Sequence, residues 1–63
     1  MSLVYRMPSM GRAIDVATIL QVNQVDAREE LRSCQPCLVV EGQSPHADAA
    51  VRRIEPQAEL ILS

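Results

Sequence analysis

The second half of the chain contains two apolar runs separated by one amphipathic segment, and this pattern limits the possible folds most strongly. The first run, residues 37–40, has no alternation, which is typical of a strand buried on both faces of a parallel sheet. A helix separates it from the second run at 60–62. The pattern predicts a right-handed β-α-β unit, with a strand near 37–41, a helix near 45–54 and a parallel strand near 58–62.

The predicted helix has signals at both ends. Ser44 is a favoured N-cap, and Pro45 takes the first helical position, where its missing N–H costs nothing. Pro56 prevents continuation beyond the last turn. Between these ends, one apolar stripe follows the helical period, so the helix should cover a sheet with this face. The stripe consists of Ala47, Ala50, Val51 and Ile54.

The first half of the chain gives weaker signals. Residues 1–12 are predicted to be a flexible N-terminus or a short strand at 2–6. The apolar residues that follow fit neither strict alternation nor one helical stripe, so residues 14–25 remain open between helix and strand. Asp26 and Glu29 form a capping-box pattern that favours helix further on. We expect residues 13–63 to form a single small two-layer α/β domain with a mainly helical 13–33 segment.

The size and composition of the chain favour an oligomer. The chain has 63 residues with no Phe, no Trp and one Tyr, so its core lacks the large aromatic side chains that bury most area. Two cysteines cannot supply the several disulfides of small secreted domains. Two parallel strands also leave open sheet edges. We therefore expect a homodimer.

The charge and hydropathy of the chain exclude some classes of partner. The net charge is −2, and the arginines are spread along the chain rather than gathered in a basic patch, which disfavours nucleic-acid binding. The sequence shows no apolar run of about 18 residues and no signal-peptide pattern. We expect no contact with a membrane and a cytoplasmic location.

The segment Cys34-Gln35-Pro36-Cys37 is the first candidate for chemistry. Its spacing permits a disulfide or a shared metal ion, and a proline before the second cysteine is found in thioredoxin-type redox sites. In those sites the motif opens a helix, whereas an apolar strand follows Cys37 here. The simpler interpretation is a buried Cys37 and a loop thiol at Cys34. One cysteine pair with His46 and either Glu41 or Asp48 is too little for a structural zinc site, so we predict no metal and no cofactor.

The loop at 41–46 is the second candidate. In open parallel sheets, ligands bind beyond the carboxyl ends of the strands, where the next helix offers free N–H groups to an anion. Glu41, Ser44 and His46 border this place. The simpler interpretation is that Gly42 makes the turn, Ser44 caps the helix and the other two side chains are solvated, because one glycine falls far short of a phosphate-loop signature.

Several short segments of the chain match one family in part. They are Asp26-Ala27-Arg28, Leu31-Arg32, Gln35-Pro36, Arg53-Ile54-Glu55-Pro56 and Glu59-Leu60-Ile61. Together they resemble small sulfur carriers of the TusA type, which are two-layer α/β domains with a Cys-Pro-x-Pro motif at the start of a helix. The resemblance implies sulfur transfer by Cys34, although Ser33-Cys34 stands where that motif has Cys-Pro.

A second partial match lies at the end of the predicted buried strand. Val39-Val40-Glu41-Gly42, followed by a helix, is similar to the opening strand of Toprim nucleotidyl-transfer domains, whose glutamate helps catalysis. This resemblance implies a catalytic role for Glu41. The later Asp-x-Asp of that family is absent from the sequence.

The sequence leaves open whether the chain is an enzyme, with the balance against it, because it has one histidine and no nucleophile-elbow motif. The leading hypothesis is a small non-enzymatic protein-interaction module, which would be a regulator, an inhibitor or an accessory subunit. It would act as a homodimer or with another protein. One alternative is a thiol-based sulfur carrier or redox protein that uses Cys34 and Cys37. The other is anion or nucleotide binding at 41–46.

Overall fold

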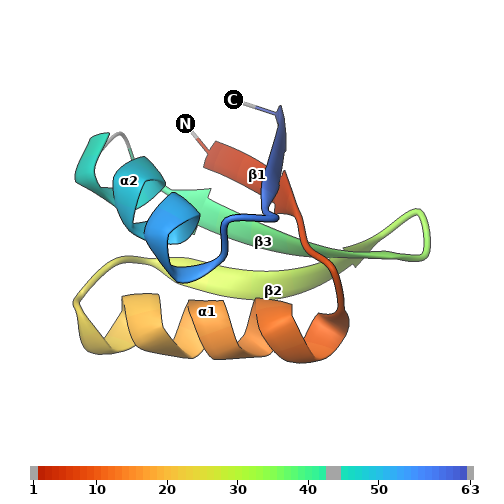
Figure 1. The fold of residues 1–63 in the computed structure, drawn as a ribbon, viewed down its shortest axis with the longest axis horizontal. Helices are drawn as coiled ribbons and strands as arrows, with labels where there is room; N and C mark the ends of the chain where they lie inside the picture. Colours follow the sequence, from red (N-terminus) through yellow and green to blue (C-terminus); the bar gives the residue numbers. More distant parts are fainter. Residues whose placement is uncertain (1, 43–44, 63) are drawn as a thin grey trace.

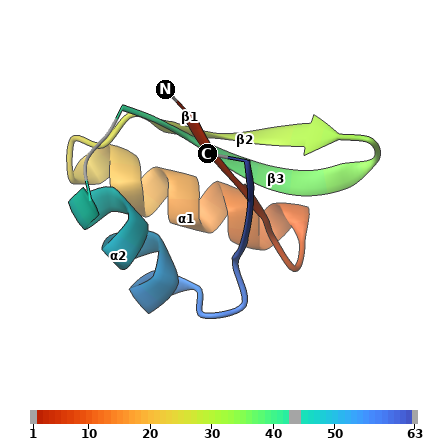
Figure 2. The ribbon, with the colours of Figure 1, turned by 90° about the horizontal axis from the view of Figure 1, so that it is seen from above.

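The computed structural model describes residues 2–42 and 45–62, which form four strands and two helices (Figure 1). In chain order these are β1 (Ser2–Arg6), α1 (Met10–Val22), β2 (Ala27–Arg32), β3 (Gln35–Glu41), α2 (Pro45–Ile54) and β4 (Glu59–Leu62). The strands make one sheet in the order β2-β3-β1-β4, and all neighbours are antiparallel. Both helices cover the same face of the sheet (Figure 2). This order of elements is the split β-α-β topology of ferredoxin-like domains.

The expected small two-layer α/β domain is confirmed, and β3, α2 and β4 lie close to the predicted bounds. The predicted pairing of two parallel neighbours is wrong, because β1 lies between β3 and β4 and pairs antiparallel with both. Residues 37–40 are indeed all buried. However, only Leu38 and Val40 pack under the helices, whereas Cys37 and Val39 belong to a separate cluster on the opposite, open face. The burial of residues 37–40 on both faces of β3 is therefore not caused by a parallel sheet.

Residues 2–6 form the strand that was one of the two alternatives for the N-terminus. This strand is at the centre of the sheet, and Val4 and Tyr5 are fully buried on its two faces. After β1, helix α1 begins behind Ser9, whose hydroxyl accepts a hydrogen bond from the Arg12 N–H at 3.1 Å. Residues 14–22 are thus helical, and the left-handed backbone of Gln24, with φ of 64°, follows the end of the helix.

The prediction of helix for the later part of 13–33 is wrong, because Ala27–Arg32 is strand β2. Every residue of β2 pairs with a residue of β3. This ladder outweighs the capping-box pattern at Asp26 and Glu29, since tertiary pairing overrides local preference in short segments. The turn that joins the two strands consists of Ser33 and Cys34, which have φ of 50° and 63°. Two consecutive left-handed residues are the geometry of a type I′ hairpin turn.

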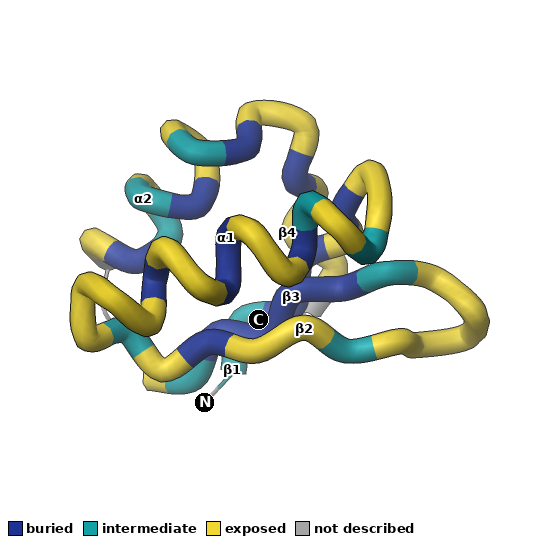
Figure 3. Tube along the Cα trace, turned by 90° about the horizontal axis from the view of Figure 1, so that it is seen from below, coloured by how far each residue is buried: buried dark blue, intermediate teal, exposed yellow. Residues whose placement is uncertain are grey.

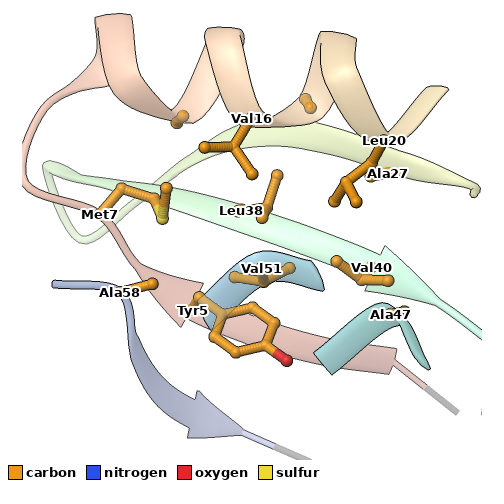
Figure 4. Packing of buried hydrophobic residues seen from close by; sticks show 12 residues of the cluster. Tyr5, Met7, Val16, Leu20, Ala27, Leu38, Val40, Ala47, Val51 and Ala58 are labelled. Carbon is orange, nitrogen blue, oxygen red and sulfur yellow. The ribbon is translucent and has the colours of Figure 1, made fainter. Parts of the chain in front are cut away.

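The core lies between the helices and the sheet, as the buried stretches of each element show (Figure 3). Tyr5 is the only aromatic residue of the chain, and its ring lies beside Val51 of α2 (Figure 4). The Tyr5 hydroxyl donates a hydrogen bond to Asp48, so the polar end of this fully buried side chain is satisfied. The other large side chains of this core that are fully buried are Val16, Leu20, Leu38, Val40 and Val51.

Candidate interaction surface

The two edges of the sheet differ in chemistry. Edge strand β2 reads Ala-Arg-Glu-Glu-Leu-Arg, so four of its six residues are charged. Charged side chains along an edge prevent other strands from pairing with it. Edge strand β4 reads Glu-Leu-Ile-Leu, and Leu60 and Ile61 are 37% and 46% exposed. The edge at β4 therefore combines exposed apolar side chains with a row of backbone groups that have no partner strand among the described residues. Its protection consists of its four-residue length, the register shift against β1 and one charge, whereas β2 carries four charges.

The inner side of β4 is fixed by its pairing with β1. Leu60 lies opposite Tyr5, which faces the helices, and Glu59 lies opposite Arg6 on the open face of the sheet. The register then shifts by one residue. The guanidinium of Arg6 contacts the Glu59 carboxylate at 2.6 Å. The single charge of β4 is thus already paired within the chain.

The open face of the sheet is not a second apolar surface. Val4, Cys37 and Val39 are the buried apolar residues described on this face, and they are 0–1% exposed although no helix covers them. By strand register, the charged residues around them share this face. These residues form three ion pairs: Arg6 with Glu59 at 2.6 Å, Arg28 with Glu41 at 3.6 Å, and Arg32 with Glu30. Long charged side chains shield the small apolar cluster, which explains why residues 37–40 are buried on both sides.

The two cysteines are placed differently, and neither is in a disulfide. Cys34 is exposed in the β2–β3 turn, which projects beyond the start of α1 (Figures 1 and 2). Cys37 is buried within β3 at 1% exposure. Cys34 is thus in a hairpin turn, not at the start of a helix, where the redox and sulfur-carrier motifs place their reactive cysteine. Within residues 2–42 and 45–62 there is no cluster of three or more His, Cys, Asp and Glu side chains that could hold a metal ion.

This placement predicts a large difference in thiol reactivity. We expect Cys34 to react with a thiol reagent at the rate of an unstructured peptide, because it is exposed. Cys37 should react only through unfolding, at least about 100-fold more slowly, because a domain of this size opens rarely. Mass spectrometry of a Cys34→Ser variant against a Cys37→Ser variant measures the two rates separately. Rapid labelling of Cys37 in the folded protein would contradict the structure, and a disulfide on mild oxidation would favour the redox alternative.

The loop at 41–46 is described only in part. Ser44 lies outside the described residues, so its predicted roles are not addressed. Gly42 has φ of 98°, a backbone that favours glycine. Glu41 accepts a hydrogen bond from Ser2 and contacts Arg28, and these partners hold the pKa of Glu41 below its usual value. His46 is exposed in the first turn of α2. These contacts of Glu41 join the end of β3 to the neighbouring strands β1 and β2.

Two further carboxylates have structural partners. Glu55 is buried, and its Oε1 lies 2.7 Å from Nε of Arg12, which lowers the pKa of Glu55. This pair ties the end of α2 to the start of α1. The hydrogen bond from Tyr5 and the contact with Arg52 at 3.1 Å lower the pKa of Asp48. The depressed pKa values thus come from contacts that join elements of the fold.

The sequence did not predict an interaction site at Leu60 and Ile61. It predicted a strand there, but as the parallel neighbour of residues 37–40. The available signal was the strand's lack of polar alternation, which is unusual at an edge. Of the other exposed large apolar residues, Ile14, Ile19 and Val22 lie on α1, where the backbone offers no unpaired groups to a partner strand. Leu31 lies on the charged edge strand β2.

Neither helix of the described residues is long and apolar enough to cross a membrane. Comparison of the chain with protein-family models, with curated proteins and with solved structures gives no match.

Proposed function

We propose that this chain is a small non-enzymatic protein-interaction module that self-associates as a homodimer through the free edge of β4. In this proposal it acts in the cytoplasm as a regulator, an inhibitor or an accessory subunit, and it binds no nucleic acid. The contact adds one strand to another across backbone hydrogen bonds, with Leu60 and Ile61 as apolar anchors. The observation that carries the proposal is the contrast between the charged edge at β2 and the apolar edge at β4.

The arrangement of the ionisable groups supports a non-enzymatic role. Among the described residues, the carboxylates with shifted pKa are those paired with Arg or hydroxyl groups across elements, namely Glu41, Asp48 and Glu55. Such pairs stabilise a fold, whereas a catalytic acid or base keeps a proton-transfer partner free. Thiol chemistry at Cys34 remains the alternative that the labelling experiment above decides.

The proposal predicts a mass that depends on concentration. The mean mass measured by light scattering should rise with protein concentration from 7.0 kDa towards twice that value. The midpoint of this rise should lie at a protein concentration on the order of 10–100 µM, because a short strand edge buries less surface than a standard interface. Leu60→Lys should raise the dissociation constant at least about tenfold, since a charge must then be desolvated at the edge.

The matched control is Leu31→Lys on β2, where the leucine is more exposed, at 64%, and the edge is already charged. This variant should dimerise like the unmodified chain. A chain that stays at 7.0 kDa over the whole range, or equal loss in both variants, would refute the proposal.

A further inference from the structure

We propose that two copies of the chain pair β4 with β4 in antiparallel orientation about a two-fold axis at Leu60, which joins two four-stranded sheets into one continuous sheet. This inference rests on the proposed homodimer and specifies its geometry. Leu60 of one copy then lies opposite Leu60 of the other, and Glu59 lies opposite Ile61. All four helices lie on the same face of the joined sheet, because opposed residues of an antiparallel pair share a face.

The alternation of side chains limits the position of the axis. Directly opposed residues must point to the same face, so a two-fold axis in an antiparallel pair passes through a residue position and not between two. An axis at Ile61 would oppose positions 60 and 62. These positions pair with Tyr5 and Val4 of β1, which lie on opposite faces, so the register shift opposes this axis. The shift leaves Ile61 without a partner on β1, and the axis at Leu60 requires Ile61 to share the open face with Glu59.

Repulsion between like charges excludes a two-fold axis at Glu59. An axis at Glu59 would place two carboxylates directly opposite each other, and like charges across a strand pair are destabilising. With the axis at Leu60, each Glu59 faces an apolar residue and stays paired with its own Arg6 at 2.6 Å. Two copies therefore meet without an unpaired charge, and their apolar residues meet each other. This match is the reason for choosing a second copy of the chain as the partner.

The other edge explains why the assembly stops at two copies. Pairing β4 with β2 of the next copy would be heterologous and would extend without limit into a fibre. The charges of Arg28, Glu29, Glu30 and Arg32 oppose this pairing with an apolar strand. In the β4–β4 dimer, both charged β2 strands form the outer edges. The joined sheet is thus closed by the same residues that protect the single chain.

Cysteine cross-linking tests the register, in a Cys34→Ser background and with the thiol oxidant diamide. Leu60→Cys should form a covalent dimer, because directly opposed positions have Cα separations of about 4.5–5.5 Å, within the range of a disulfide. Glu59→Cys alone and Ile61→Cys alone should cross-link at least about tenfold less, since each would face its own copy at roughly 8 Å. An equal mixture of these two variants should give the mixed dimer, which keeps Leu60 intact.

The possible outcomes distinguish the proposed strand register from the proposed homodimer. Cross-linking of Leu60→Cys together with the mixed dimer supports the register. A dimer in light scattering that cross-links best through Ile61→Cys or Glu59→Cys overturns the register and leaves the proposed function standing. A dimer with no cross-link in any combination places the contact on another surface and overturns the inference. A monomer at all concentrations overturns the inference together with the homodimer.

Discussion

Leu38→Ala is expected to cost about 3 kcal/mol of the free energy of unfolding. Leu38 is 0% exposed at the middle of β3, and it lies between the α1 residues Val16 and Leu20 and the α2 residue Val51 (Figure 4). Both helices thus lose contacts when its side chain is removed. A domain of 63 residues has roughly 3–9 kcal/mol in total, so a third or more of the stability disappears.

Chemical denaturation followed by circular dichroism measures this loss as a lower midpoint. Leu31→Ala is the matched control, because it makes the same change on the neighbouring strand at a position that is 64% exposed. Its effect should stay within about 0.5 kcal/mol. Equal effects of the two substitutions would mean that the core between the helices and β3 is not as described. If Leu38→Ala does not fold at all, Leu38→Val at a smaller expected loss gives the same comparison.

The second helix can be predicted from local signals in the sequence, whereas the order of the strands in the sheet cannot. Pro45 and Pro56 limit α2 through contacts within a few residues, and the bounds of α2 agree with the prediction. The position of β1 depends on partners more than 30 residues away, such as Val39 opposite Val4. No pattern in β1 or β3 alone specifies this pairing, and burial on both faces suggested parallel neighbours instead.

Strand β2 and the candidate interaction surface at β4 could not be predicted from the sequence, for related reasons. Four charged residues in β2 resemble an exposed helix, and the turn at Ser33 and Cys34 lacks the Asn-Gly signal of a type I′ hairpin. Without that hairpin, neither edge of the sheet can be assigned. The sequence does not identify Leu60 and Ile61 as edge residues, because a short apolar strand has the same sequence whether it lies inside a sheet or at its edge.

Tyr5 should make the fold sensitive to alkaline pH. Burial first, and the hydrogen bond to Asp48 second, raise the pKa of Tyr5 far above its usual value of 10.0. The unfolded chain loses the phenolic proton above pH about 10, whereas the folded chain keeps it. The folded state then binds more protons, so this contribution to stability is present below pH 10 and is lost at about 1.4 kcal/mol per pH unit as the pH rises towards the folded pKa.

The absence of other aromatic residues and of Lys makes this effect measurable. Tyr5 is the only Tyr and there is no Trp, so tyrosinate absorbance reports this side chain alone. The absorbance should rise together with the loss of circular dichroism, because ionisation requires unfolding. Tyr5→Phe keeps the buried ring and should lose about 1–2 kcal/mol at neutral pH, with a flatter alkaline decline. Tyrosinate that forms near pH 10 while the chain remains folded would show that the hydroxyl is neither buried nor bound to Asp48, and the anchoring of α2 to β1 would need another explanation.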